Sequence, residues 1–271
     1  MANVKDKVLV VTGGTGGIGE GCVKEMAKAG AKVVFCGRSV EKGQSIEKEM
    51  TDQGCLVKYV RADVTIAEDN KRIIDETIAL FGRVDGILCN AGGGNGKLHF
   101  THQYTPEEWY YLVNLNFNAA FFLSKYALPY MMKQQGGSII FMGSATSLKP
   151  QPYQSHYGPP KAGMYQLSRQ ISLEYCRFGI RANMISPGAT WTEIFQKAGI
   201  SDEQAAATSP AKKIAYPSDI ADVAMFLFSD DSKTVTGTNI YADYAYGCGN
   251  RFDQMTGFET RENAKNIMDE C

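Results

Sequence analysis

Short runs of β-branched and apolar residues recur along the chain, and a segment long enough for a helix separates most of them from the next. Strands joined by helix-length connections form βαβ units, and the buried strands of a parallel sheet read as continuous apolar runs. The pattern therefore predicts an α/β fold with a doubly wound parallel sheet of about seven strands flanked by helices. The expected strands are residues 8–13, 32–37, 55–64, 86–92, 137–144, 180–188 and 238–243.

The 271 residues can form one α/β domain or two smaller ones. No segment between the expected strands has the composition of an interdomain linker, and no internal repeat or low-complexity tract occurs. We therefore predict one dinucleotide-binding catalytic domain over residues 1–246. Residues 247–271 follow the last strand, are polar and charged, and are expected to form a C-terminal tail or a lid.

The charges of the chain nearly cancel, with 28 Lys and Arg against 29 Asp and Glu. This balance disfavours nucleic acid or an anionic membrane as a partner and favours a small molecule. The sequence contains neither a signal peptide nor a run of 18 apolar residues, so we expect a soluble, cytoplasmic protein. Seven cysteines without a CxxC pair predict neither a disulfide framework nor a zinc site.

A glycine-rich turn, TGGTGGIG at residues 12–19, follows the first expected strand and opens a helical pattern. Glycines permit a tight turn and let backbone N–H groups approach a pyrophosphate at the positive end of the following helix. This strand–turn–helix context predicts a Rossmann-like dinucleotide site. The expected cofactor contacts in the turn are Gly13, Thr15, Gly16, Gly17, Ile18 and Gly19.

The TGxxxGxG spacing of this turn resembles the short-chain dehydrogenase/reductase family in its classical form. Further marks of that family follow in order across nearly the whole chain, and their order matters because a YxxxK is expected about once by chance among 14 Tyr. The resemblance implies an NAD(P)-dependent oxidoreductase that interconverts a secondary alcohol and a ketone. The marks are Asp63-Val64, Asn90-Ala91-Gly92, Asn116, Ser144, Tyr157 with Lys161, and Pro187-Gly188 with Thr192.

Four of these residues are the predicted catalytic set. Tyr157 and Lys161 stand four apart and share one face of a helix, so we expect the ammonium to lower the pKa of the phenol towards working pH. The resemblance implies that Tyr157 carries the proton and that Ser144 holds the reacting oxygen. It also implies that Asn116 steadies a water that relays protons from Lys161. No metal is expected, because His99 and His102 have no third ligand nearby.

The remaining cofactor contacts also come from the resemblance. It places Asp63 and Val64 at the adenine, Asn90, Ala91 and Gly92 near the adenosine ribose, and Pro187, Gly188 and Thr192 near the nicotinamide, together with Tyr157 and Lys161.

The second expected strand ends in Cys36-Gly37-Arg38-Ser39, where enzymes that prefer NAD usually carry an acidic residue. Glycine leaves room for a 2′-phosphate, Arg38 can pair with it, and Ser39 can donate to it. NADP(H) is therefore favoured. NAD(H) stays open, because Gly16 falls where many NADP-preferring relatives have a basic residue.

Two departures from the family pattern carry structural expectations. Gly158-Pro159-Pro160 lie between the catalytic tyrosine and lysine, and since proline is tolerated only in the first turn, a helix should begin near Tyr157. Tyr244-Ala245 replace a glycine pair of the family. Relatives usually assemble as dimers or tetramers through helices expected here at 105–134 and 157–177, so the resemblance implies a homo-oligomer.

The substrate is left open by the sequence. Loops 93–104 and 193–209 lie where relatives shape their substrate sites, and several aromatic residues suit a ring-shaped substrate. A hydroxysteroid is one candidate, since residues 246–248 resemble the C-terminal region of some hydroxysteroid dehydrogenases; a sugar or polyol and a 3-oxoacyl thioester are others. An inactive dinucleotide sensor or scaffold, and an epimerase or dehydratase, are the alternative functions. The aromatic residues are Phe100, Tyr104, Tyr153, His156 and Trp191.

Overall fold

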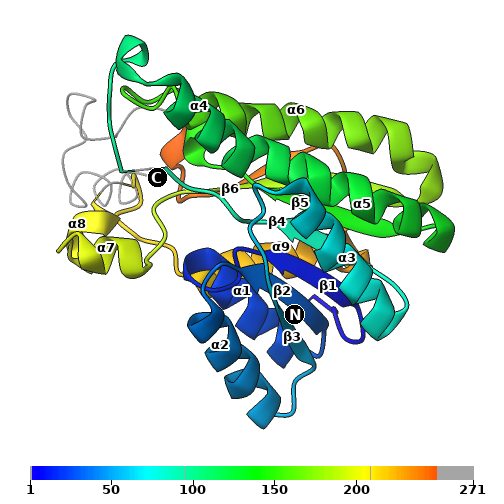
Figure 1. The fold of residues 1–271 in the computed structure, drawn as a ribbon. Coiled ribbons are helices and arrows are strands. Elements are labelled where there is room, and N and C mark those ends of the chain that lie inside the picture. The colour runs from blue at the N-terminus through cyan, green and yellow to red at the C-terminus, as the bar shows by residue number, and fades with distance from the viewer. Residues whose placement is uncertain (1, 95, 208, 249–271) are drawn as a thin grey trace, which may run out of the picture.

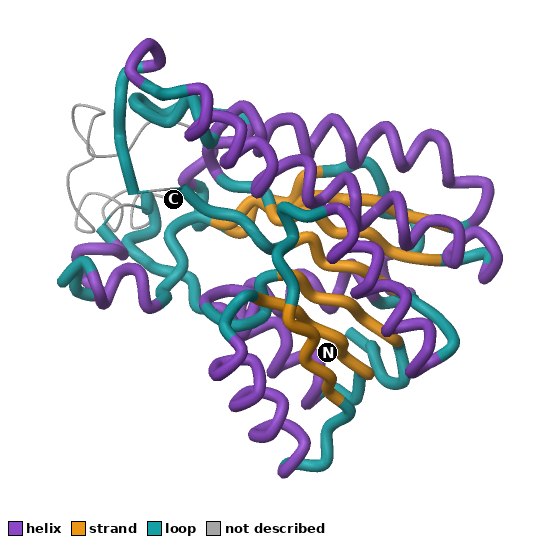
Figure 2. Tube along the Cα trace, viewed as in Figure 1, coloured by secondary structure: helices purple, strands orange, loops and turns teal. Residues whose placement is uncertain are grey.

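The computed structural model of the chain describes residues 2–94, 96–207 and 209–248. Its described part contains a single parallel sheet of seven strands in the order β3-β2-β1-β4-β5-β6-β7 (Figure 1, Figure 2). The order reverses between β1 and β4, which confirms the predicted doubly wound, Rossmann-like fold. The strands are β1 (Val8–Thr12), β2 (Lys32–Gly37), β3 (Val57–Arg61), β4 (Gly86–Cys89), β5 (Gly137–Met142), β6 (Ile180–Pro187) and β7 (Asn239–Ala242).

Helices cover both faces of the sheet (Figure 1). One face packs against α1 (Gly17–Lys28), α2 (Val40–Asp52) and α9 (Pro217–Phe228), and the other against α3 (Ala67–Phe81), α5 (Ala119–Gln134) and α6 (Gly158–Tyr175). Both layers bury apolar side chains against strands whose residues are buried on either side, as in a parallel sheet. Shorter helices are α4 (Pro106–Val113), α7 (Glu193–Lys197) and α8 (Asp202–Ala206), with single turns η1 (Thr101–Gln103), η3 (Ala145–Ser147), η4 (Cys176–Phe178), η5 (Asp230–Ser232) and η6 (Tyr246–Cys248).

Helix α6 begins where the prolines require it. Tyr157 is the residue before the helix, and Pro159 and Pro160 lie in its first turn, where a missing N–H is not needed for helical hydrogen bonding. The sequence expectation of a start near Tyr157 is therefore correct.

The single helix expected over residues 105–134 is interrupted. A π-helical turn, η2 (Asn114–Asn118), separates α4 from α5. Widening of the helical turn by one residue is a tertiary feature that the apolar periodicity does not reveal, and such turns often mark functional sites. The candidate catalytic residue Asn116 lies at its centre.

Tyr244 and Ala245 adopt left-handed backbone conformations, with φ of 51° and 67°. Residues with a Cβ are disfavoured there, whereas glycine is not. The glycine pair usual in the family therefore fits the backbone at these two positions, and this chain holds the same conformation with larger residues.

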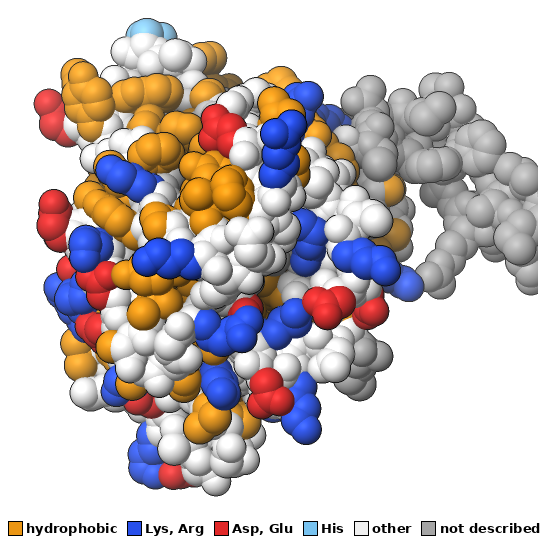
Figure 3. Space-filling view, turned by 90° about the vertical axis from the view of Figure 1, so that its right-hand side faces the viewer, with side chains coloured by type: hydrophobic (Ala, Val, Ile, Leu, Met, Phe, Trp, Pro, Cys, Tyr) orange, Lys and Arg blue, Asp and Glu red, His pale blue; other side chains and the backbone are white. Residues whose placement is uncertain are grey.

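The surface combines charges of both signs. On the face drawn in Figure 3, lysine and arginine side chains lie among aspartate and glutamate side chains, with hydrophobic areas between them. Within residues 2–94, 96–207 and 209–248, no helix has the length and apolar character needed to cross a membrane. In the same ranges, no group of three or more His, Cys, Asp or Glu side chains could hold a metal ion.

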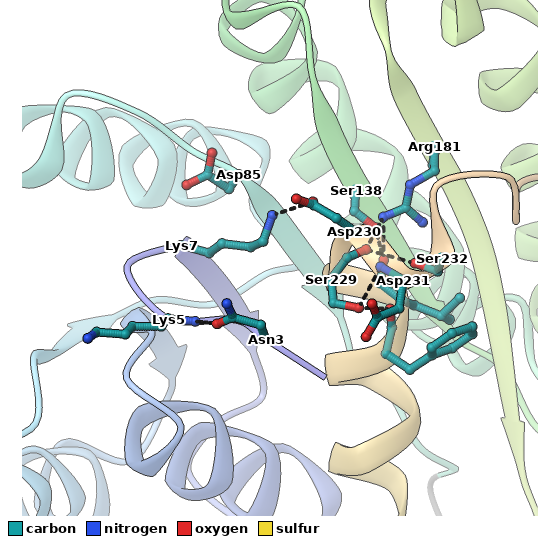
Figure 4. A network of polar contacts seen from close by, with 12 residues as sticks. Asn3, Lys5, Lys7, Asp85, Ser138, Arg181, Ser229, Asp230, Asp231 and Ser232 are labelled. Atoms are coloured by element: carbon teal, nitrogen blue, oxygen red, sulfur yellow. Dashed lines mark hydrogen bonds and ion pairs between the residues drawn. The ribbon is translucent and has the colours of Figure 1, made fainter. Parts of the chain in front are cut away.

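Figure 4 shows a polar network near the start of β1 and the end of α9. The Arg181 guanidinium on β6 donates to the carbonyl oxygens of Leu227 at 2.7 Å and Ser229 at 3.3 Å. These carbonyls lie at the end of α9 and also accept from the hydroxyls of Ser138 at 2.8 Å and Ser232 at 3.0 Å, so Arg181 is the charged one of two side-chain donors to each. Nearby, Lys7 and the highly exposed Asp230 form an ion pair at 2.9 Å.

We predict that Arg181→Leu lowers the free energy of unfolding by about 2 kcal/mol, because it removes a charged donor from partly buried carbonyls. The control Lys7→Ala should cost at most about 1 kcal/mol, since exposed ion pairs contribute little. Urea denaturation of both variants measures the difference. Equal losses would contradict a special role for Arg181.

Candidate active site

A cavity of about 480 Å³ lies beyond the carboxyl ends of the central strands and gathers most of the predicted site residues. Ligands of open α/β sheets bind in this crevice, where the strand order reverses. Its volume falls in the range of small-molecule sites. The predicted residues that line it are Gly13, Gly16, Gly17, Ile18, Asn90, Ala91, Gly92, Ser144, Tyr157, Lys161, Pro187, Gly188 and Thr192.

The glycine-rich turn forms one wall, and close contacts require the glycine at positions 13 and 19. A Cβ added to Gly19 would lie 2.2 Å from the carbonyl oxygen of Gly13, and one added to Gly13 would lie 2.9 Å from the Cα of Ala91. Gly17, with φ of 56°, begins α1. The N-terminal amides of α1 and the open space beside Gly16 together suit a pyrophosphate.

The turn after β4 is tied to the end of β1. The Thr12 hydroxyl accepts hydrogen bonds from the backbone N–H groups of Asn90 and Ala91, both at 3.1 Å. The Asn90 side-chain amide donates to the carbonyl oxygen of Thr12 at 2.9 Å. Asn90 therefore supports the sheet edge, and the backbone of the Asn90–Gly92 turn faces the cavity.

Lys161 is 2% exposed and reaches the cavity from α6. Its Nζ donates to the carbonyl oxygen of Met142, at the end of β5, at 2.7 Å. Burial lowers the pKa of Lys161 from its usual 10.5 to about 7, because an ammonium is poorly solvated there. Near neutral pH this amine can therefore both gain and lose a proton.

Tyr157 lies beside Lys161, whose Nζ is 5.6 Å from the centre of the phenol ring. Burial raises the pKa of Tyr157 above its usual value, and a hydrogen bond with Ser144 acts in the opposite direction. The sequence analysis expected Lys161 to lower this pKa, whereas the pKa is raised. The reason is that burial disfavours both charged forms, the phenolate and the ammonium.

Asn116 lies beneath the cavity and is 1% exposed. Its amide donates to the carbonyl oxygens of Gly93 at 2.9 Å and Leu112 at 3.1 Å, and its Oδ1 accepts from the N–H of Gly93 at 2.9 Å. A Cβ on Gly92 would lie 2.7 Å from Asn116 Oδ1 and 2.9 Å from Lys161 Nζ. Asn116 and Lys161 therefore meet at Gly92.

Ser144 follows β5 and caps the single turn η3. Its Oγ accepts hydrogen bonds from the N–H of Thr146 at 3.2 Å and from the Thr146 hydroxyl at 3.0 Å. Its own N–H donates to Ser147 Oγ at 2.9 Å. These contacts hold the Ser144 hydroxyl on the cavity wall beside Tyr157.

The residues expected at the adenine and at a 2′-phosphate, which are Arg38, Ser39, Asp63 and Val64, do not line this cavity. Arg38 is exposed, and its guanidinium lies 3.4 Å from the Tyr111 hydroxyl. Ser39 caps α2 by accepting from the N–H of Lys42. The Asp63 carboxylate accepts from Thr65 N–H and hydroxyl at 3.0 and 2.7 Å, next to the buried Val64.

The structure gives a reason for the glycine at position 37 that differs from the expected one. A Cβ there would lie 2.3 Å from the hydroxyl oxygen of Thr15, so the glycine admits the Thr15 side chain. Thr15 belongs to the predicted phosphate turn but does not line the cavity.

The segment between Ser144 and Tyr157 lines a second cavity, of about 570 Å³. Phe100 and Tyr153 meet edge-to-face on its wall with ring centres 5.0 Å apart. Among the described residues, three of the five buried side-chain polar atoms without a hydrogen-bond partner come just before Tyr157. They are Gln154 Oε1, Ser155 Oγ and His156 Nδ1.

The other predicted aromatic residues pack against neighbouring rings beside the two cavities. The ring of His156 is buried, and its centre lies 4.4 Å from the centre of the Tyr104 ring. This contact joins the loop after β4 to the segment before Tyr157. Trp191 stacks on Phe195 with ring centres 5.8 Å apart. The predicted aromatic residues therefore do not form one pocket. Phe100 and Tyr153 line the second cavity, and the others pack against residues beside the two cavities.

Several lining residues were not predicted. Met142 contributes through its backbone carbonyl, for which a sequence has no signal. Glu193 lines the cavity and pairs with Lys42 of α2 at 3.1 Å. Glu193 lies in a loop that was expected to shape the site, but its partner is 151 positions away in the chain. The others are Gly143, Ala189 and Thr190, together with Gly93, Phe195 and Lys197 from the two loops that were expected to shape the substrate site.

Known proteins resemble this chain over most of its length. L-rhamnose-1-dehydrogenase of Scheffersomyces stipitis is 34% identical over 245 residues, which cover 88% of this chain and 94% of that protein. L-fucose dehydrogenase of Bos taurus is 32% identical over 252 residues, covering 89% and 91%. These two relatives are named as sugar dehydrogenases.

Solved structures agree on the fold. Levodione reductase superposes with a TM-score of 0.84 at 29% identity, covering 91% of this chain and 99% of that one. The protein gox2181 superposes with a TM-score of 0.85 at 27% identity, covering 91% and 98%. The family model described as enoyl-(acyl carrier protein) reductase matches residues 13–246. With the glycine turn, Ser144, Tyr157 and Lys161 around one cavity, the chain belongs to the short-chain dehydrogenase/reductase family of NAD(P)-dependent oxidoreductases.

Proposed function

We propose that this protein interconverts a secondary alcohol and a ketone, with Tyr157 as the proton carrier and NADP(H) as the preferred cofactor. The observation that carries the proposal is the convergence of Ser144, Tyr157 and Lys161 on the cavity that the glycine-rich turn also lines. A phosphate cradle and a phenol–amine pair in one cavity match the needs of hydride transfer coupled to proton transfer.

The glycine cradle fits a dinucleotide, because the N-terminus of α1 and the open space at Gly16 face the cavity. When bound, the nicotinamide group supplies or accepts the hydride. Two segments that follow strands also line the cavity and would hold the cofactor. They are Asn90–Gly92, after β4, and the segment from Pro187 to Thr192, at the end of β6 and beyond it.

The chain's own residues handle the oxygen and its proton. Ser144 donates a hydrogen bond to the carbonyl oxygen and orients it, and Tyr157 gives that oxygen its proton during reduction and takes it back during oxidation. Lys161, with a pKa of about 7, can replace the proton on Tyr157 near neutral pH. Asn116, fixed against Gly93, would hold the water through which Lys161 exchanges protons with solvent.

We infer a hydroxylated ring, such as a sugar, as the substrate class. The two curated relatives are named for L-rhamnose and L-fucose, and levodione reductase is named for a small ketone. The second cavity supports this choice, since the polar residues Thr101 and Gln151 line it and can form hydrogen bonds with the hydroxyl groups of a sugar. The Phe100–Tyr153 pair can stack against the C–H face of a sugar.

Cofactor preference rests on Arg38. It is exposed beside the start of α2, where the backbone amides of a helix N-terminus also favour phosphate. Among the described residues, its guanidinium makes one weak contact, at 3.4 Å to the Tyr111 hydroxyl, so the side chain can turn to a 2′-phosphate.

We predict that Tyr157→Phe lowers the rate of cofactor oxidation or reduction by roughly 100- to 10 000-fold, because a phenyl ring cannot carry the proton. The assay pairs both NADP(H) and NAD(H) with L-rhamnose, L-fucose, a cyclic diketone and a hydroxysteroid. The control Tyr165→Phe, two turns along α6, should keep its activity. Tight cofactor binding without Tyr157-dependent turnover of any compound would favour the inactive sensor.

We predict that Arg38→Ala raises the Kd for NADPH by about 10- to 100-fold, the loss expected for a charged hydrogen bond, and the Kd for NADH by less than about twofold. Arg177→Ala, in η4 at the other end of α6, is the control and should change neither value. Quenching of protein fluorescence on titration measures the affinities of the wild type and of both variants for each cofactor. Equal weakening of both cofactors would overturn the 2′-phosphate role.

We predict that the stability of the wild type rises relative to Lys161→Met as the pH increases from 7 to 9. The unfolded chain binds a proton at an amine with the usual pKa of 10.5, whereas the folded chain releases it with a pKa of about 7. Raising the pH from 7 to 9 reduces this extra proton binding by the unfolded chain, so the free energy of unfolding of the wild type rises by about 2 kcal/mol relative to the variant. Urea denaturation at several pH values measures it; parallel curves for the two proteins would show that Lys161 is not destabilised by burial.

A further inference from the structure

The hydroxyl of Ser144 is held by one neighbour through two contacts. The N–H of Thr146 donates to Ser144 Oγ at 3.2 Å, and the Thr146 hydroxyl lies 3.0 Å from the same atom. Both groups belong to η3, the single turn that Ser144 caps. Thr146 does not line the first cavity, but it does line the second one.

The direction of these hydrogen bonds follows from their chemistry. A backbone N–H can only donate, so it occupies one lone pair of Ser144 Oγ. A ketone oxygen can only accept, so Ser144 must use its single proton to bind it. The contact between the two hydroxyls is then compatible with one arrangement alone, in which Thr146 donates to the second lone pair of Ser144.

We propose that Thr146 is a positioning residue for the reaction: its hydroxyl holds Ser144 as a hydrogen-bond donor directed at the reacting oxygen. This inference rests on the proposed function. With both lone pairs of Ser144 occupied by Thr146, the Ser144 proton is left for an acceptor in the cavity that Ser144 and Tyr157 both line. Donation from Thr146 also polarises Ser144 and strengthens the bond that Ser144 donates.

A second consequence concerns Tyr157. The hydrogen bond with Ser144 lowers the pKa of Tyr157 against the raising effect of burial, and Lys161 is the charged group that faces the ring. Before a substrate binds, the single Ser144 proton can be donated to the Tyr157 phenolate instead, and a Ser144 hydroxyl free to rotate would make this bond less often. Loss of the Thr146 hydroxyl should therefore move the pH dependence of alcohol oxidation to higher pH.

Thr146→Val and Thr146→Ser are a matched pair, because valine keeps the shape without the hydroxyl and serine keeps the hydroxyl. Each is assayed with the compound turned over fastest in the panel that contains L-rhamnose and L-fucose. We expect Thr146→Val to lower kcat by about fivefold to tenfold, the value of one neutral hydrogen bond, with KM changed less than about twofold. In Thr146→Val, the rise of the alcohol-oxidation rate with pH should move to higher pH by about 0.5 to 1 pH unit. Thr146→Ser should restore both kcat and this pH dependence.

The same substitution in a Ser144→Ala background separates positioning from direct substrate binding. If Thr146 acts through Ser144, Thr146→Val causes no further loss there. Thermal unfolding and NADPH binding should match the wild type in every variant, which excludes a general structural defect.

Two outcomes would overturn the proposal while leaving the proposed function intact. The first is Tyr157-dependent turnover that Thr146→Val does not change. The second is a Thr146→Val loss that is equally large with and without Ser144, since that loss would belong to direct contact with the substrate. Absence of Tyr157-dependent turnover in the wild type would instead overturn the proposed function and the positioning role together.

Discussion

The buried amine of Lys161 is the constraint around which the site is organised. A lysine side chain is seldom fully buried, and its charged form is unfavourable there unless polar groups surround it. The fold supplies the Met142 carbonyl at 2.7 Å from the end of β5, and α6 carries the amine to it. Because α6 begins right after Tyr157, the same helix turn fixes the phenol beside the amine. One strand end and one helix start therefore define the centre of the chemistry.

The surroundings of this pair are rigid for reasons that can be traced to individual residues. Gly92 has no side chain, so Asn116 and Lys161 can approach it from different elements. Asn116 is held by the backbone of Gly93 in both directions, and the π-helical turn around it sets where that amide lies. Thr146 holds Ser144 in a similar way. Preorganised donors of this kind stabilise developing charge without having to reorient.

Local patterns were enough to predict the sheet, the glycine turn and the start of α6, because each depends on neighbours in sequence: apolar runs for strands, glycines for a tight turn, and prolines for a first helical turn. Features that depend on distant contacts were not predictable. The π turn at Asn114–Asn118 breaks an otherwise regular helical pattern, and the pKa of Lys161 depends on its depth in the folded chain. The reason for Gly37, which is contact with Thr15, likewise appears only when β1 and β2 lie side by side.

The central claim is that Ser144 and Tyr157 share one substrate oxygen beside the nicotinamide. A crystal structure of the protein with NADPH and a slowly reduced ketone tests it most directly. We expect the carbonyl oxygen to lie within about 2.6–3.2 Å of both hydroxyls and Lys161 to lie near the nicotinamide ribose. A ketone bound with its oxygen beyond reach of Tyr157, or a Tyr157 hydroxyl turned away from the dinucleotide, would contradict it.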